Sequence, residues 1–472
     1  MGFLSFGFLL LLFPLTVVIY HVLHKMGQRR LAEPVLLAAS LIFYATYSVE
    51  GLVVLICSLL FNGICSRALM RKEKQKGLLF FGISADLVLL ILFRYSDFIG
   101  RNAAMISGRE FTPVDIFVPA GISYFTFRQI AFLVDSYRHE TCDMSFVEYA
   151  LFITYFPSLI MGPVTLHGEF ISQLRDEKSR KPDYYDLSTG FIWLTVGMTK
   201  KLLLVPVFAG AADFAYGDIG RLSFAESWAC ALAYTIQIYL DFSGYCDMAG
   251  GVSRMLGIDL PVNFRSPYKA LSIKDFWKKW HITLNRFLTR YIYIPLGGSR
   301  KGMIRTLINI MIIFIISGIW HGAAWTFIAW GLFHGCLMVF ERLLGDRADK
   351  LPSPVRWLYT FFMVNIGWVF FRAGSMGDAL AYLKKMFGAF SLYLSPEFYS
   401  SFGLNSIPVV TRHLNYAVPL IYIFVMAGIL IPANLYDRKY KPGALLAAGT
   451  VILFALSLNF ISQATGFIYF KF

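Results

Sequence analysis

Two histidines lie in segments where an imidazole is costly to bury. His321 falls in GIWHGAAWTF, between two long apolar runs, and His281 falls in FWKKWHITLN, a basic and aromatic stretch. An imidazole at bilayer depth has lost much of its water and needs a partner or a chemical role. It titrates near neutral pH, which makes it the usual group for proton transfer. Each histidine is therefore a candidate catalytic residue, with a structural histidine bonded to a neighbouring helix as the alternative.

The stretch around His281 combines a row of cations with an apolar stripe. Nine Lys and Arg residues and one acid, Asp275, occur between positions 262 and 302. The Ser272–Asp275 spacing has the form of a capping box, and apolar residues then recur every three or four positions as far as Tyr291. This pattern predicts an amphipathic helix over 273–291, with His281 on or beside its apolar face. An interfacial helix whose cations reach the headgroups accounts for the charges, although it does not account for the histidine.

A second polar island, DFSGYCD, follows the apolar run AYTIQIYL. Its members are Asp241, Ser243, Tyr245 and Asp247. Carboxylates in an apolar segment are costly unless they are paired, cap a helix or line a wet cavity. The two readings are a direct role in the site and the anchoring of an arginine, with Arg254 and Arg265 as the expected partners.

His334 follows His321 by thirteen positions. On one straight helix these residues would lie about 20 Å apart and on different faces. His334 is therefore expected to be a packing residue.

Composition places the elements that position these residues in a membrane. Hydrophobic residues make up 57% of the 472 residues and charged residues only 15%, and the apolar runs are continuous. We therefore expect an all-α, polytopic integral membrane protein with about 11 transmembrane helices plus re-entrant or amphipathic helices. No polar interval is long enough for a soluble domain, so residues 1–472 are interpreted as a single membrane domain.

The net charge of +14 is scattered among the spans, which argues against a nucleic-acid partner. The six cysteines and the histidines show no metal-ligand spacing, so no metal site is expected.

Basic residues predict the orientation. Lys25, Arg29 and Arg30 follow the first apolar run, with no small-residue cleavage site between. The loop after the third run is also basic, at Arg67, Arg71, Lys72, Lys74 and Lys76. By the positive-inside rule both loops are cytoplasmic and the N-terminus faces outward.

Three long segments resemble the membrane-bound O-acyltransferase family, and specifically its bacterial branch that includes the alginate O-acetyltransferase membrane subunit. They read DFSGYCDMAGGVSRMLGIDLPVNFRSPY, IKDFWKKWHITLNRFLTRYIYIPLGGSR and GIWHGAAWTFIAWGLFHG. The resemblance is strongest over 119–341. It implies a ring of helices around a central tunnel, with His321 catalytic and His281 as the second functional residue.

The resemblance also implies a chemistry. An acetyl group would pass from a cytosolic thioester, either acetyl-CoA or an acyl-carrier protein, to an extracytoplasmic polysaccharide hydroxyl, with no tightly bound cofactor. His321 would accept the hydroxyl proton, and the basic helix face would receive phosphates or an acidic carrier protein. The donor or tunnel candidates are Trp277, Trp280, Lys278, Lys279, Asn285, Arg290, Trp320, Trp325, Asp241, Ser243, Tyr245 and Asp247.

Several points stay open at this level. The resemblance implies an alginate-, cellulose- or peptidoglycan-type polymer as acceptor and an extracytoplasmic SGNH-type acetyltransferase or a similar accessory subunit as partner. The protein itself is expected to be a multi-pass protein of the bacterial inner (cytoplasmic) membrane. D-alanyl transfer to teichoic acid is the alternative with the same chemistry, since that branch shares the FW–WH and WHG motifs. A transporter or flippase is the non-enzymatic alternative, in which Asp241, Asp247 and His321 would relay ions or protons.

Overall fold

The computed structural model describes residues 2–71, 75–113, 116–176, 183–404, 411–441, 443–463 and 466–468. Regular structure in these residues is entirely helical, as the sequence predicts. Lys72 and Lys74, which contribute to the predicted cytoplasmic loop, lie outside the described residues.

Six helical segments of the described chain are long and apolar enough to cross a membrane. They are Phe8–Lys25, Val49–Arg71, Lys76–Arg94, Tyr184–Gly217, Met303–His321 and Trp325–Arg347, and two shorter apolar helices are α21 (Leu414–Leu430) and α22 (Ala444–Asn459). Other predicted runs fold as shorter or more polar helices, such as α2 (Arg29–Ala45) and α12 (Phe224–Met255). The chain is a polytopic helical membrane protein.

The contacts divide the chain into two compact units. Unit 1 contains Met1–Val196 and Tyr245–Pro261, and unit 2 contains Gly197–Gly244 and Val262–Phe472. The long helix α12 contributes its first part to unit 2 and its last part, from Tyr245 onward, to unit 1.

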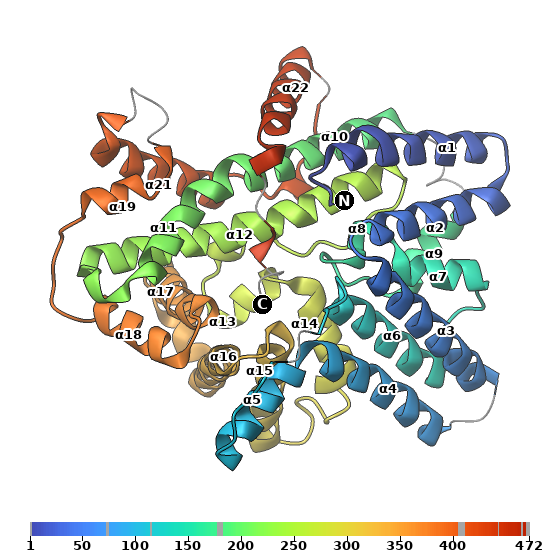
Figure 1. The fold of residues 1–472 in the computed structure, drawn as a ribbon, viewed down its shortest axis with the longest axis horizontal. Helices are drawn as coiled ribbons and strands as arrows, with labels where there is room; N and C mark the ends of the chain where they lie inside the picture. The colour runs from blue at the N-terminus through green and yellow to red at the C-terminus, as the bar shows by residue number, and fades with distance from the viewer. Residues whose placement is uncertain are drawn as a thin grey trace. The chain divides into compact units, whose positions relative to one another are not determined.

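Unit 1 is built from helices (Figure 1). The side chains buried among them are mostly apolar. Its main helices are α1 (Phe13–Lys25), α2, α3 (Val49–Arg71), α4 (Lys76–Arg94), α5 (Ser96–Ser107), α6 (Ile122–Tyr137), α7 (Phe146–Thr154), α8 (Phe156–Leu159), α9 (His167–Arg175) and most of α10 (Tyr184–Thr199). Cys65 and Leu69 of α3 pack against Leu133 of α6. A capping box between Ser145 and Glu148 starts α7, and Arg175 of α9 is bonded to the same glutamate. Unit 1 contains the first part of the region 119–341, over which the resemblance is strongest.

Unit 2 contains both candidate histidines. Its helices are α11 (Val205–Gly217), the first part of α12, α13 (Ile273–Lys279), α14 (Ile282–Leu288), α15 (Met303–His321), α16 (Trp325–Leu344), α17 (Ser353–Arg372), α18 (Met376–Met386), α19 (Pro396–Ser400), α21 and α22. Figure 1 shows α15 and α16 side by side, and these two helices form the most extensive helix pair. Glycines permit this approach, because a Cβ at Gly318 or Gly331 would lie within 2.4 Å of a carbonyl oxygen of the facing helix.

The chain reverses between His321 and His334. Residues 322–324 leave the helical conformation, so α15 and α16 form a hairpin. The two histidines therefore do not lie on one straight helix, and the separation of about 20 Å that such a helix would give does not apply. Both histidines contact Trp330, with ring centroids 4.9 Å from His321 and 5.2 Å from His334.

The predicted helix over 273–291 is interrupted at its middle. Ser272 accepts a hydrogen bond from the Asp275 N–H and starts α13, as expected, but α13 ends at Lys279 and α14 begins at Ile282. His281 lies at the break in the left-handed conformation, with φ of 46°. The periodicity of the apolar residues continues across the break, which is why the sequence pattern did not reveal it.

Candidate functional site

His321 ends α15 inside a cage of aromatic rings. Its side chain is buried, and ring centroids of Trp320, Trp330 and Phe371 lie 4.9, 4.9 and 5.2 Å away. The cage combines residues of α15, α16 and α17, so only the packing of three helices creates it. His321 is the last residue of α15 and is followed by Gly322 in an extended conformation, which puts the imidazole at the turn of the α15–α16 hairpin.

His281 shares this interior with His321. The two ring centroids are 6.4 Å apart, and Trp320 lies 5.9 Å from His281. The prediction that tertiary folding brings the two histidines together across 40 residues of chain is therefore consistent with the geometry. His281 lies in the α13–α14 junction, outside the six spanning segments, and burial lowers its pKa to about 3. The imidazole is therefore neutral at physiological pH.

Four tryptophans pack in the same interior. Trp280 is fully buried and packs on Trp368, with centroids 4.8 Å apart, while Trp277 packs on Trp330 at 5.5 Å. The indole N–H groups of Trp277 and Trp330 are buried and have no hydrogen-bond partner within the described residues. Unpaired N–H donors beside an imidazole are the groups that can stabilise a developing oxyanion.

The α13–α14 junction is held by amide and carboxylate side chains. Asn285 donates to the carbonyl oxygens of Trp277 and Trp280, at 2.6 and 2.9 Å, so its N–H groups close the end of α13. Glu341 of α16 accepts from the backbone N–H groups of Ile273 and Lys274, at 2.6 and 3.0 Å, and fixes the start of α13. Helix α13 is thus attached at both of its ends.

The cations of α13 differ in their surroundings. Lys278 is exposed, whereas Lys279 is partly buried and its ammonium lies 2.8 Å from Asp275. Arg290 is partly buried over the ring of Tyr291 in the segment after α14. Of the two predicted donor-binding lysines, Lys278 is the one that faces solvent.

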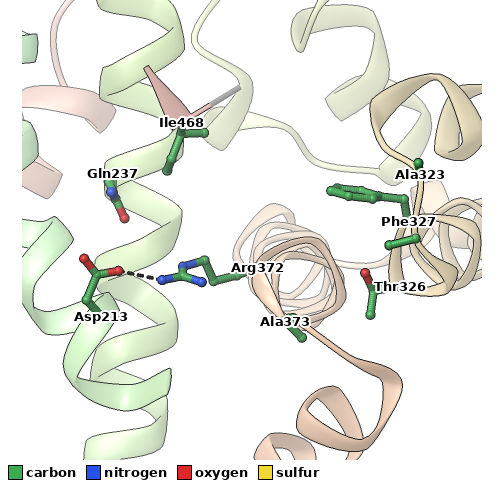
Figure 2. A pocket seen from close by; sticks show the side chains of 10 residues that line it. Asp213, Gln237, Ala323, Thr326, Phe327, Arg372, Ala373 and Ile468 are labelled. Atoms are coloured by element: carbon green, nitrogen blue, oxygen red, sulfur yellow. Dashed lines mark hydrogen bonds and ion pairs between the residues drawn. The ribbon is translucent and has the colours of Figure 1, made fainter. Parts of the chain in front are cut away.

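A cavity of about 550 Å³ lies at the turn of the α15–α16 hairpin (Figure 2). Its lining residues are Asp213, Gln237, Ala323, Ala324, Thr326, Phe327, Arg372, Ala373, Gly374 and Ile468. Figure 2 shows Arg372 reaching Asp213, with which it forms an ion pair at 2.5 Å. The amide oxygen of Gln237 and the hydroxyl of Thr326 are buried with no hydrogen-bond partner among the residues that the structure describes.

The cavity is one aromatic layer from His321. Phe327, which lines it, packs on Phe371 with centroids 5.0 Å apart, and Phe371 in turn packs on His321. Helix α16 carries Phe327 near its start and Glu341 near its end, about 20 Å apart along the axis. The cavity and the cap of α13 therefore lie at opposite ends of α16.

Asp241 and Ser243 are held by lysines of the 200–204 segment. The Lys201 ammonium bonds the Asp241 carboxylate, and the other oxygen of Asp241 accepts from the Ile468 N–H at 2.7 Å. Lys200 donates to the Ser243 hydroxyl at 3.2 Å. The expectation that Asp241 anchors Arg254 or Arg265 is wrong, because a lysine distant in sequence supplies the charge.

The two arginines have other carboxylate partners. Arg254 pairs with Asp186 and Asp259, and Arg265 pairs with Asp437. The Arg254–Asp186 and Arg265–Asp437 pairs join segments that are distant in sequence, whereas Arg254 and Asp259 are only five residues apart.

The remaining candidates differ in their placement. Tyr245 and Asp247 are buried in unit 1, where Tyr245 packs on Phe3 with centroids 5.2 Å apart. Trp325 begins α16 and is 56% exposed, so it is no part of the buried cage. Trp320 does belong to that cage.

Several residues of the site were not predicted from the sequence. Asn263 contacts His281, Trp330 and Phe371 contact His321, and Gln237 lines the cavity. Trp330 lies nine positions after His321 in the quoted motif, so the tryptophan-rich pattern was the one available clue. The others come from segments that only the fold brings together.

Comparison with known proteins assigns the chain to a family. Residues 37–375 match the family model described as MBOAT, the membrane-bound O-acyltransferase family. The peptidoglycan O-acetyltransferase of Helicobacter pylori is 35% identical over 93% of this chain and 91% of its own length. A protein of Azotobacter vinelandii named probable alginate O-acetylase is 35% identical over 89% of this chain and 85% of its own. The teichoic acid D-alanyltransferase of Bacillus subtilis is 26% identical over 64% and 79%. The chain belongs to the membrane-bound O-acyltransferase family and is an O-acyltransferase.

Proposed function

We propose that this protein takes an acetyl group from a thioester on the cytosolic side of a bacterial cell membrane and passes it outward for O-acetylation of an envelope polysaccharide. The observation that carries the proposal is the buried pair of imidazoles, with ring centroids 6.4 Å apart, together with the indole N–H groups of Trp277 and Trp330, which have no hydrogen-bond partner among the described residues. A neutral imidazole accepts the proton of a hydroxyl, and the indole N–H groups stabilise the tetrahedral oxyanion.

His321 is the proposed base. Its imidazole takes the hydroxyl proton as the new C–O bond forms, and it returns the proton to the leaving sulfur as the C–S bond breaks. Trp330, in ring contact with His321 at a centroid distance of 4.9 Å, is the proposed indole donor for the oxyanion.

The two ends of α16 suit two substrates. At one end, Glu341 holds α13, whose exposed Lys278 is a contact for the phosphates of coenzyme A or for an acidic carrier protein. At the other end, the cavity offers the polar atoms of Gln237 and Thr326 beside the Asp213–Arg372 pair, which suits a hydroxylated acceptor. By the positive-inside rule, the lysine end faces the cytosol and the N-terminus faces outward.

The acceptor class rests on the relatives. The two relatives at 35% identity are named for peptidoglycan and alginate, which favours an acetylated polysaccharide. The D-alanyltransferase at 26% keeps D-alanyl transfer to teichoic acid as the second candidate. An extracytoplasmic SGNH-type acetyltransferase or a similar subunit is the proposed partner for delivery to the polymer.

Reconstituted protein distinguishes the donors directly. Proteoliposomes supplied with radiolabelled acetyl-CoA, acetylated carrier protein or D-alanylated carrier protein are assayed for cleavage of the thioester and, with the extracytoplasmic partner present, for transfer to wall and exopolysaccharide acceptors. Transfer of acetyl groups is the expected result. Exclusive use of the D-alanyl donor contradicts the acetyl assignment, and transfer from none of the three contradicts the proposed function.

A further inference from the structure

Asn263 makes an unusual set of contacts with three consecutive residues. Its side-chain oxygen lies 3.2 Å from His281 Nδ1, 3.2 Å from the Thr283 backbone N and 2.9 Å from the Thr283 hydroxyl. Its backbone carbonyl accepts from the Ile282 N–H at 3.0 Å. These bonds hold the junction in which His281 takes a left-handed conformation, which costs a non-glycine residue about 1–2 kcal/mol.

These contacts determine the tautomer of His281. A backbone N–H is always a donor, so the Asn263 atom that faces Thr283 is the carbonyl oxygen and not the amide nitrogen. The ring nitrogen that faces the same oxygen must then carry a proton, which is Nδ1. A neutral imidazole has one N–H, and the Nε2 atom therefore presents a lone pair.

The ring that carries this lone pair lies in the interior that His281 shares with His321. Nε2 of His281 is buried and has no hydrogen-bond partner among the described residues. The rings in contact with His281 are Phe242 of α12 and Trp320 and His321 of α15, at 4.8, 5.9 and 6.4 Å. An acceptor at this place repels an oxyanion, so neutral His281 is unsuited to the oxyanion role.

We propose that Asn263 is a positioning residue that holds His281 as the hydrogen-bond acceptor for the amide N–H of a pantetheine thioester. The inference rests on the proposed function and deepens it. Coenzyme A and carrier proteins share this amide, which lies two carbons from the reacting sulfur. The hydroxyl of the acceptor substrate gives its proton to His321. The amide N–H of the thioester donor is then the group from which His281 can accept a hydrogen bond.

The surroundings of His281 support its contact with the thioester donor. His281 follows α13 directly, and that helix carries the exposed Lys278 on one face and the buried Trp277 on the other. An arm that begins at the lysine and runs along the buried face of α13 reaches the junction at His281. At this junction the amide N–H of the pantetheine arm donates to Nε2 of His281. The thioester of the arm then lies in the interior that His281 shares with His321.

Two short donors test the inference. S-acetyl-N-acetylcysteamine keeps the amide N–H, and S-acetyl-2-mercaptoethyl acetate replaces it with an ester oxygen. Wild-type protein is expected to prefer the amide donor by about tenfold or more in kcat/KM, because the ester leaves the buried lone pair unpaired. His281→Ala and Asn263→Ala should lose this preference, and His281→Gln, which restores an acceptor oxygen, should recover part of it.

Thr283→Val is the matched control. It removes one contact of the Asn263 oxygen but keeps the Thr283 backbone N–H and the His281 contact, so the amide preference should persist. If the short donors are not turned over, the same preference is measured as competition against acetyl-CoA or acetylated carrier protein. Equal behaviour of the two compounds with wild-type protein overturns the inference.

The tautomer is measured without any turnover. In protein labelled with ¹⁵N-histidine, the His281 resonances, assigned with His281→Gln, should show a protonated Nδ1 and a bare Nε2. In Asn263→Ala the population should shift toward Nε2–H. A protonated Nε2 in the wild type overturns the inference even if acetyl transfer is normal. Conversely, wild-type protein could show the expected tautomer but transfer no acyl group from any thioester. That result would contradict the proposed function and leave the positioning role of Asn263 intact.

Discussion

At the residue scale, the proposed chemistry depends on His321 and on the rings that enclose it. His321→Ala is expected to lower acyl transfer by about 10³-fold, because the hydroxyl then loses its base while the aromatic cage remains. Turnover in proteoliposomes measures the effect, and thermal unfolding in detergent measures folding. His413→Ala, at an exposed histidine before α21, is the control. Near-normal turnover of His321→Ala would make this histidine structural.

The indole N–H of Trp330 makes a separate prediction. Trp330→Phe keeps an aromatic ring against His321 but removes the unpaired donor, so kcat should fall by about 10²–10³-fold with little change in the donor KM. Trp357→Phe is the matched control, since the Trp357 N–H bonds the Tyr268 carbonyl outside the histidine cage. A rise in KM with unchanged kcat would exclude the oxyanion role.

At the element scale, α13 connects a charged surface to a buried site. Lys278→Glu should raise the donor KM and weaken its dependence on salt, since an exposed ammonium contributes through screened attraction to phosphates. Lys384→Glu, an exposed lysine of α18, is the control for net charge. Equal effects of the two reversals would show that the site is not at α13.

The attachment of α13 to α16 predicts a coupled loss of stability and activity. Glu341→Ala leaves two N–H groups at the start of α13 without their acceptor and should cost about 1–2 kcal/mol of stability. Glu341→Gln keeps one acceptor oxygen and should lose less. Thermal unfolding and turnover are compared for both variants. Unchanged unfolding of Glu341→Ala would show that Ser272 alone suffices to start the helix.

At the scale of the whole molecule, the two ends of α16 should open to opposite sides of the membrane. With the exposed Cys57 and Cys336 replaced by serine, a cysteine at Lys278 is expected to react with an impermeant thiol reagent only from the cytosol. A cysteine at Gly374, in the cavity lining, is expected to react only from outside. Labelling of both positions in intact cells and inverted vesicles checks the orientation. Reaction of both from one side would contradict a path from donor to acceptor through unit 2.

The sequence by itself determined the class of protein and the two histidines. Continuous apolar runs with few charges require helices in a membrane, because only there can that much apolar surface be buried along the chain. His281 and His321 were identifiable because an imidazole among apolar residues needs a reason. Ser272 was recognisable as the start of α13 for an equally local reason, since a helix cap involves only neighbouring residues.

Tertiary structure decided everything that depends on contacts between distant segments. The break at His281 is held by Asn263, and the charge of Asp241 is balanced by Lys201, 40 residues earlier. The reversal after His321 places Trp330 against the imidazole, and α17 adds Phe371. Local periodicity records which face of a helix is apolar, but it carries no information on which other helix covers that face. The base candidate was therefore visible in the sequence, whereas its cage and the tautomer of its neighbour emerged only from the packed helices.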